Sequence, residues 1–431
     1  MSLNEDICKM KFIFFGLTLS LISFSVLSQD VELTKIRVNT LASEKFSGRG
    51  YTNNAANNSA DYIAEELAKA GVKSFNDTYF QNFYYSVNTF PSKLTVKLDG
   101  KTLNPGSDYL IGAASPSIKN KYSLFLPDSL LLNDTTKFKD VIKLQDFKQT
   151  MLVIDYAQTQ NIDIKKFYIK QMLQNFTFAG VVELIPDELM WSVSTKQQNY
   201  PVVKIKRESY NRKASKIQLT VVSEFIPKFE AKNVIGFIPG EKDEFIVFTA
   251  HYDHLGTMGK KVYIPGAQDN ASGTAMILDL ADFYSKNKPE YSIAFMLFFG
   301  EEAGLLGSIN YVLKPFFDLT KIKMLINLDM VGTGDEGITI VNGTEPDYTE
   351  VWDCFNNINI ENEYFTILKA RAKSANSDHY PFNEMGVKAV FIYSMGGKTY
   401  YHNPKDKPET LTYTGYNQLF GLLTKFVEEY R

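Results

Sequence analysis

Cysteine, histidine and tryptophan are scarce in this chain, whose 431 residues include two cysteines, four histidines and two tryptophans. Cys8 precedes an N-terminal apolar run, and removal of that run leaves Cys354 without a partner for an intrachain disulfide. The net charge of −3 and the lack of a long basic run give no indication of nucleic-acid binding. With 44% hydrophobic and 14% aromatic residues, the chain can nevertheless form a large core and more than one structural unit.

Several residues that could carry chemistry follow short apolar runs. These runs are 245–250 before His251, 293–299 before Glu301 and Glu302, and 324–328 before Asp329. Such runs, separated by helical segments, are typical of parallel strands in an α/β sheet. Because open sheets of this kind bind ligands beyond the carboxyl ends of their strands, the pattern predicts a common site there.

Glu301 and Glu302 are adjacent carboxylates at the end of an apolar strand, and no Lys or Arg occurs between Lys288 and Lys314. Burial of both would be costly unless they are paired or bind metal. Asp269 precedes the predicted helix 273–285, where it serves either as a metal ligand or as a helix cap. As a ligand it could reach a site shared by neighbouring strands.

A count of charges favours two divalent ions over one. We take two imidazoles and three carboxylates as ligands: His251, Asp269, Glu302, Asp329 and His402. The carboxylates carry three negative charges and a hydroxide adds another, and two dications balance that sum. Such ligands without thiolate fit zinc, with cobalt or manganese as alternatives. The pattern therefore predicts a two-metal hydrolase site with two Zn²⁺ per chain.

The order of the motifs is the most specific feature of the sequence. The motifs are His-x-Asp at 251–253, Asp-Asn at 269–270, Glu-Glu at 301–302, Asn-Leu-Asp-Met at 327–330 and Tyr-His at 401–402, accompanied by Ser-Asp-His-Tyr-Pro-Phe at 377–382 and Ser-Gly-Arg-Gly at 47–50. In this order they resemble the di-zinc metallopeptidases of clan MH, which include bacterial aminopeptidases, glutamate carboxypeptidase II and transferrin-receptor-like proteins. The resemblance covers most of residues 30–95 and 220–431.

The resemblance implies how the metals are held. His251 and Asp329 would bind one zinc ion. Glu302 and His402 would bind the other, and Asp269 would bridge the two. It also implies the zinc exopeptidase fold, a mixed, mostly parallel central sheet flanked by helices.

Further roles come from the same resemblance. Glu301 would be the general base, which takes a proton from a water shared by the metals and returns it to the leaving amine. Tyr401 would donate to the developing oxyanion, and Asp253 would orient His251. Asp378 and His379 would shape the substrate pocket rather than bind metal.

The chain is expected to have four parts. They are a signal segment at 1–28, a first peptidase part at 29–97, an insert at 98–218 and a second peptidase part with the metal site at 219–431. Lys9, Lys11 and the apolar run 12–27 predict a secretory signal that is cleaved near Ser28, for secretion or for the periplasm. A retained membrane anchor is the alternative, and contact with a membrane is expected only in that case.

The predicted insert has no evident chemistry of its own. Its strand-like runs, such as 151–156 and 180–185, loosely resemble the protease-associated domain of related peptidases. Two roles stay open for it, a lid that selects substrates and a packing module.

We therefore expect an exported zinc exopeptidase that acts on peptides, with an aminopeptidase as the main interpretation. A carboxypeptidase of the same family would need cationic groups for the substrate carboxylate, and Arg371 is the only arginine between Arg212 and Arg431. A glutaminyl-cyclase-like acyltransferase would keep one zinc ion, and the presence of both His251 and Asp329 argues against it.

Overall fold

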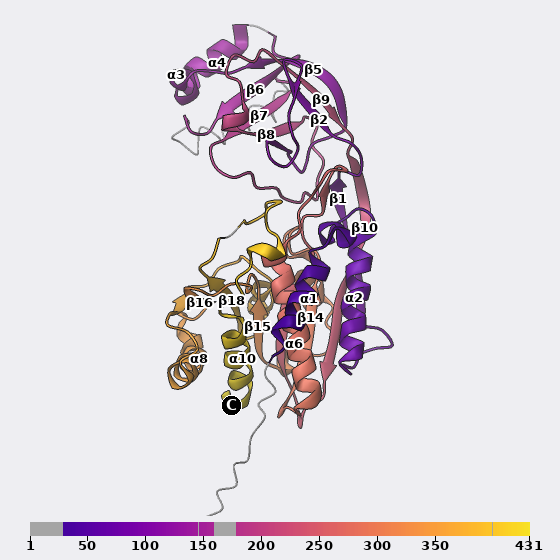
Figure 1. The fold of residues 1–431 in the computed structure, drawn as a ribbon, viewed down its shortest axis with the longest axis vertical. Helices are drawn as coiled ribbons and strands as arrows, with labels where there is room; N and C mark the ends of the chain where they lie inside the picture. The colour runs from indigo at the N-terminus through magenta and orange to yellow at the C-terminus, as the bar shows by residue number, and fades with distance from the viewer. Residues whose placement is uncertain (1–28, 145, 159–177, 399) are drawn as a thin grey trace, which may run out of the picture.

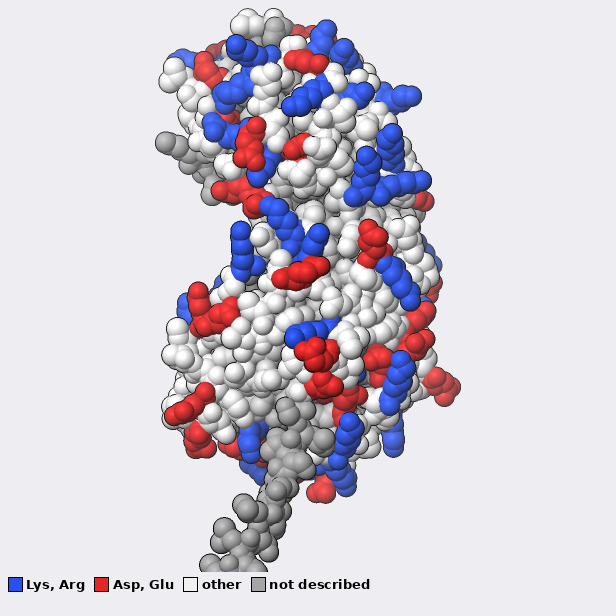
Figure 2. Space-filling model, in the orientation of Figure 1, with Lys and Arg blue, Asp and Glu red and all other residues white. Residues whose placement is uncertain are grey.

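The computed structural model describes residues 29–144, 146–158, 178–398 and 400–431, so the predicted signal segment lies outside the described residues. Within these ranges the chain forms two lobes, each built on an eight-stranded sheet, which Figure 1 shows one above the other. Figure 2 shows the molecule hollowed between the lobes on one side, with side chains of both charges on each lobe. No helix in the described ranges is long and apolar enough to cross a membrane.

The lower lobe contains a mixed sheet. Its strands in spatial order are β1 (Phe80–Thr89), β10 (Glu224–Ile238), β14 (Tyr291–Phe298), β11 (Lys242–His251), β15 (Ile322–Leu328), β18 (Ala389–Met395), β16 (Gly337–Val341) and β17 (Leu368–Arg371). The adjacent strands β14, β11, β15 and β18 are parallel, whereas β10 and β16 flank them in antiparallel pairing. The prediction of a mixed sheet with parallel strands at its centre is confirmed.

Helices cover both faces of this sheet. One face packs against α1 (Val31–Leu41), α2 (Ala55–Lys69), α6 (Ser272–Lys286), α8 (Thr349–Asn362) and α10 (Tyr416–Glu429), and the other against α7 (Leu306–Leu313) and α9 (His379–Glu384). Successive side chains of a strand point to opposite faces. On β11, Ile246 and Phe248 therefore pack on the face covered by α1, α2, α6, α8 and α10. Phe245 and Val247 pack on the face covered by α7 and α9.

The upper lobe is built on a second sheet. Its strands in spatial order are β3 (Lys101–Thr102), β2 (Thr95–Leu98), β9 (Lys216–Val221), β5 (Ile118–Phe125), β6 (Thr150–Asp155), β7 (Gly180–Ile185), β8 (Val202–Lys206) and β4 (Tyr109–Ile111), with α3 (Ser129–Asn133) and α4 (Thr135–Leu144) beside them. The expected insert boundaries, 98 and 218, fall inside β2 and β9. These strands pair with each other, Val96 opposite Leu219, so both belong wholly to this sheet.

The lobes are joined by strands and by packing. β1 and β10 pair along their length up to Thr89 and Glu224, where the chain enters and leaves the upper lobe. The short hairpin of β12 (Thr257–Met258) and β13 (Val262–Tyr263) follows β11, a strand of the lower lobe, in the sequence. Its residues Met258 and Val262 nevertheless lie in the apolar core of the upper sheet, so the two lobes share that core.

Candidate metal centre

The candidate ligands lie at the carboxyl ends of the central parallel strands. His251 is the last residue of β11, and Asp329 directly follows β15. Glu302 comes shortly after β14. Asp269 lies in the single turn η3 (Ala267–Ala271) that enters α6. Parallel strands thus deliver side chains from distant parts of the chain to one edge of the sheet.

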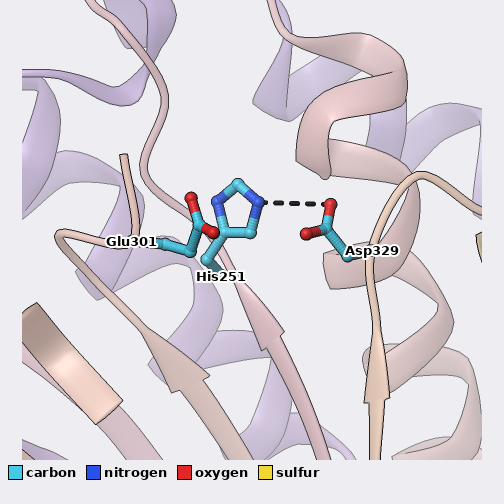
Figure 3. Close-up of side chains that lie close together, drawn as sticks. All are labelled: His251, Glu301 and Asp329. Atoms are coloured by element: carbon cyan, nitrogen blue, oxygen red, sulfur yellow. Dashed lines mark hydrogen bonds and ion pairs between the residues drawn. The ribbon is translucent and has the colours of Figure 1, made fainter. Parts of the chain in front are cut away.

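His251, Glu301 and Asp329 form the first cluster, drawn in Figure 3. The Nε2 atom of His251 lies 3.3 Å from Oδ1 of Asp329. Glu301 lies on the other side of the imidazole in this view, and the three candidate donor atoms are within 4.8 Å of one another. The cluster therefore places the Glu301 carboxylate directly beside two of the predicted ligands, His251 and Asp329.

Asp269 connects this cluster to a second one. Its Oδ1 atom is 3.3 Å from Nε2 of His251, and its Oδ2 atom is 3.3 Å from Nε2 of His402. The same nitrogen of His402 lies 2.9 Å from Oε2 of Glu302. One carboxylate thus presents a separate oxygen to each of two imidazoles, and the five predicted ligands form one continuous group.

The Asp253 carboxylate lies beside His251 but makes its hydrogen bonds elsewhere. Nδ1 of His251 donates to the backbone carbonyl of Asp253 at 3.1 Å, whereas the nearest carboxylate oxygen is 3.6 Å away. That carboxylate accepts from the backbone N–H groups of Glu301 and Glu302, at 3.2 and 3.3 Å. Asp253 therefore orients the histidine through its main chain and holds the two glutamates through its side chain.

Hydrogen bonds from a buried layer orient the other ligands. Nδ1 of His254 lies 2.7 Å from Oε1 of Glu302. The Ser377 hydroxyl donates to Oδ2 of Asp329 at 2.7 Å and accepts from Asn327 at 2.8 Å. Partners of this kind fix the orientation of metal-binding side chains. The Ser377 contact lies within a motif found in the sequence, yet the sequence assigned no role to Ser377.

Two further buried residues hold the turn that carries Asp269. The Asp406 carboxylate accepts from the backbone N–H groups of Gln268 and Asp269, at 2.9 and 3.1 Å. The Arg49 guanidinium, fully buried, donates to the carbonyls of Gly266 and Asp269. Sequence reasoning missed both roles, because Asp406 lies outside the recognised motifs and the partners of Arg49 are backbone groups of any residue type.

Asp378 and His379 lie near the site without joining its clusters. Asp378 is fully buried and accepts from the Ser308 hydroxyl. Burial raises the pKa of Asp378 to about 7. The His379 ring is also buried and lies against Phe391, with ring centroids 5.4 Å apart. The contacts of His379 are thus those of a packed core residue.

Tyr401 lies over a candidate ligand. Its ring stacks on His402 with centroids 3.8 Å apart, and the residue is 48% exposed. Burial of the phenol raises its pKa well above the usual range, and the Asp269 and Glu302 carboxylates raise it further. The phenol therefore keeps its proton and remains a hydrogen-bond donor.

The adjacent glutamates have opposite electrostatic surroundings. Burial raises the pKa of Glu301 well above its usual range, and the carboxylates of Glu302 and Asp329 add to that effect. Burial acts on Glu302 in the same direction, but the imidazoles of His402 and His254 outweigh it and lower the pKa of Glu302. Glu302 is thus held as a carboxylate, and Glu301 as a group that accepts a proton readily.

The donor set fits metal cations. Carboxylate oxygens and imidazole nitrogens without thiolate are ligands that zinc accepts. Arg49 is a buried cation beside these acids, but its single charge cannot balance Asp253, Asp269, Glu302 and Asp406 around it. Divalent ions would supply the missing positive charge, and the imidazole nitrogens and carboxylate oxygens that converge around Asp269 would hold them.

Comparison with known proteins relates the chain to peptidases. Residues 233–427 match "Peptidase family M28". The chain is 30% identical over 249 residues to Aminopeptidase YwaD of Bacillus subtilis (strain 168), which covers 55% of this chain and 53% of that relative. It is 31% identical over 188 residues to a probable leucine aminopeptidase of Trichophyton verrucosum (strain HKI 0517), or 42% of this chain and 50% of the relative. The chain thus spans about half the length of these curated relatives.

A solved structure matches over more of the chain. The zinc aminopeptidase from Bacillus subtilis superposes with a TM-score of 0.69 and 22% identity, covering 94% of this chain and 95% of that one. At this identity the likeness establishes the fold. The α/β architecture with large mixed sheets is therefore shared with a known zinc aminopeptidase.

Proposed function

Because residues 233–427 belong to peptidase family M28, we propose that this chain is a zinc-dependent exopeptidase that removes amino-terminal residues from peptides. One observation carries the proposal. The two oxygens of Asp269 each lie 3.3 Å from Nε2 of a different imidazole, that of His251 or that of His402. A carboxylate placed in this way would serve two neighbouring metal ions at once.

Five side chains would hold two zinc ions per chain. His251 and Asp329 would hold one, Glu302 and His402 the other, and Asp269 would lie between them. The chemistry that zinc supplies in such a site is polarisation of the scissile carbonyl and a lowered pKa of water.

The remaining residues would move the proton and stabilise charge. Glu301 would accept the proton of the attacking water and deliver it to the amine that leaves. The Asp253 carboxylate keeps Glu301 in place by accepting a hydrogen bond from the backbone N–H of Glu301. Tyr401, stacked on His402, would donate its phenolic proton to the oxyanion that develops on the substrate carbonyl.

The choice of aminopeptidase over carboxypeptidase rests on the relatives and on charge. The curated relatives above are named aminopeptidases. A carboxypeptidase needs cations that converge on the substrate carboxylate, typically arginine. Arg371, the only arginine between Arg212 and Arg431, is exposed on the edge strand β17. An ammonium group, in contrast, would find acidic partners at this site.

Two assays on the purified protein test the proposal. We expect close to two zinc ions per chain by metal analysis, loss of hydrolysis with a strong chelator, and recovery with zinc or cobalt. We also expect cleavage of aminoacyl anilides and no action on peptides with acetylated amino termini. One tightly bound zinc at full activity would instead support the cyclase, and release of residues from the carboxyl ends of acetylated peptides would support the carboxypeptidase.

The location and the insert complete the proposal. We infer export from the charged and apolar segment at 1–28, which predicts a cleaved signal. We also infer that residues 98–218 form a protease-associated-like domain. The parallel order of β5, β6, β7 and β8 supports that second inference.

A further inference from the structure

The upper lobe contacts the candidate metal centre through an extended segment, residues 188–191, between β7 and β8. Figure 1 shows the yellow chain before α10, which includes the 402–405 loop, rising toward that lobe. The backbone N–H of Trp191 donates to the carbonyl of His402 at 3.0 Å. Asn403, only 3% exposed, donates from Nδ2 to the carbonyl of Leu189 at 2.7 Å.

The same segment determines which nitrogen of His402 is free. Nδ1 of His402 lies 3.2 Å from the backbone carbonyl of Trp191. A carbonyl can only accept, so Nδ1 must carry the proton. In a neutral ring the lone pair is then on Nε2, and it is this atom that faces Asp269 and Glu302. Trp191 thus sets the tautomer that a metal ligand needs.

The backbone of His402 also depends on these contacts. Its φ is 54°, in the left-handed region that residues other than glycine rarely adopt. Such a conformation is unfavourable for a residue with a Cβ atom and persists only where surrounding contacts fix it. The hydrogen bond from Trp191 to the His402 carbonyl and the neighbouring bond from Asn403 to Leu189 supply such contacts.

Trp191 is itself fixed by the core of the upper lobe. It is 5% exposed, and its indole Nε1 donates to the carbonyl of Ile111 at 2.7 Å. Its ring also lies against Phe90, with centroids 6.1 Å apart. The position of the Trp191 carbonyl therefore depends on whether the upper lobe is folded and packed against the lower lobe.

The two imidazoles differ in this respect. His251 is oriented by the carbonyl of Asp253, two residues further along the chain. His402 is oriented by a carbonyl 211 residues away, on the other lobe. The first arrangement forms with the local turn, whereas the second requires the lobes to come together.

We propose that segment 188–191 is a positioning element for His402, and that the upper lobe thereby sets the affinity of the metal site to which His402 contributes. This inference rests on the proposed function, because it treats His402 as a metal ligand. It gives the upper lobe a role other than selecting or covering the substrate. The role is transmitted through Trp191 and Asn403, neither of which is among the proposed metal ligands.

Zinc affinity measured by competition with a chromophoric chelator tests the proposal in the full-length protein. Asn403→Ala removes the bond to Leu189, and Trp191→Phe removes the indole bond to Ile111 while it keeps an aromatic ring. We expect each variant to bind one of the two zinc ions about 10–100-fold more weakly, as is typical when a partner that orients a ligand is lost. The affinity for the other ion should change little.

Lys405→Ala provides the matched control. Lys405 pairs with Glu188 at 2.8 Å, between the same two segments, but both side chains are about half exposed, at 53% and 52%. Exposed pairs contribute little. This variant should therefore bind both ions within about twofold of the wild type. The visible spectrum of cobalt-loaded protein should change in Asn403→Ala and Trp191→Phe and stay unchanged in the control.

Hydrogen exchange in the wild type gives a measurement that does not depend on how the variants fold. Zinc should slow exchange of the Trp191 backbone N–H by about tenfold or more, because that group donates to His402. Unchanged exchange, or wild-type zinc affinity in both variants, overturns the positioning role while leaving the proposed function intact. A wild type that binds no zinc overturns the proposed function and this inference with it.

Discussion

Glu301 and Glu302 show how two adjacent residues of one type can acquire different chemistry. The backbone N–H groups of both donate to the same carboxylate, that of Asp253, so their main-chain hydrogen bonds are equivalent. Their side chains then diverge. Glu302 reaches His254 and His402, whereas Glu301 lies with His251.

We predict that Glu301→Gln keeps zinc and fold but lowers turnover by about 10²–10⁴-fold, because an amide cannot accept the proton of water. Glu302→Gln should instead weaken the binding of one zinc ion. Steady-state kinetics and metal analysis on the same preparations separate these effects. If Glu301→Gln loses zinc while Glu302→Gln retains it, the two roles are reversed.

His379 makes stability depend on pH. Burial lowers its pKa to about 4, below the ordinary value of about 6.5. Between these values the unfolded chain binds a proton that the folded chain does not. Stability from this group is therefore complete above about pH 6.5 and falls as the pH falls toward 4, by about 3 kcal/mol in total.

The measurement is the free energy of unfolding by urea between pH 7 and pH 4, compared for the wild type and His379→Phe. The variant has no imidazole to titrate and should lose less stability on acidification. Parallel curves for the two proteins would contradict the assignment of His379 as a buried neutral residue.

The individual residues that the sequence singled out and the structure brings together are those whose side chains could bind metal. Asp269 is one of them, because its place before a helix limited it to a ligand or a cap. Trp191 and Arg49 could not be found in this way. Trp191 contacts His402 through its main chain, and Arg49 binds carbonyl groups, so neither contact leaves a trace in residue types.

Among the elements, Arg49 joins the N-terminal segment to the loops around the metal centre. It donates to the carbonyls of Leu41, Tyr252, Pro265, Gly266 and Asp269. We predict that Arg49→Lys lowers the free energy of unfolding by about 3 kcal/mol or more. An ammonium keeps the charge but lacks the planar fork, and each buried acceptor left unpaired costs about 1–3 kcal/mol.

Urea denaturation measures this loss, with Arg371→Lys as the control. Arg371 is exposed on β17, and its nearest hydrogen bond, to the Tyr393 hydroxyl, is 3.5 Å long. The control should change stability by less than about 0.5 kcal/mol. Equal effects of the two substitutions would show that the carbonyl contacts of Arg49 contribute little.

The strands and helices near the site were predictable because their patterns are local. The apolar run before His251 became β11, and the helix expected at 273–285 became α6. The ends of β2 and β9 were not predictable, because their membership depends on pairing with each other. The glycine motif shows the same limit: at Gly48 φ is 65°, and a Cβ atom would lie 2.4 Å from the Ile264 carbonyl oxygen, a distant part of the chain.

At the scale of the whole molecule, the shared core predicts that the lobes unfold together. Four residues that follow β11, a strand of the lower lobe, are buried in the core of the upper lobe. They are Leu255, Met258, Val262 and Ile264. Separate melting of the upper lobe would expose them. We therefore expect a single cooperative transition rather than two.

Tryptophan fluorescence can test this cooperativity. The chain has two tryptophans, Trp191 in the upper core and Trp352 on α8. In a Trp352→Phe variant, emission reports on the upper lobe alone, while far-ultraviolet circular dichroism reports on both. The two midpoints should coincide, and an earlier fluorescence midpoint would show that the upper lobe unfolds independently.

The pairing of Thr89 with Glu224 also bears on how such a protein could acquire or exchange its upper lobe. The chain departs and returns at neighbouring points of one antiparallel ladder, so to the rest of the sheet the whole lobe is a hairpin loop. The free energy of closing a loop rises only slowly with its length. Recombination at these two positions could therefore replace one module with another and leave the order of every remaining strand unchanged.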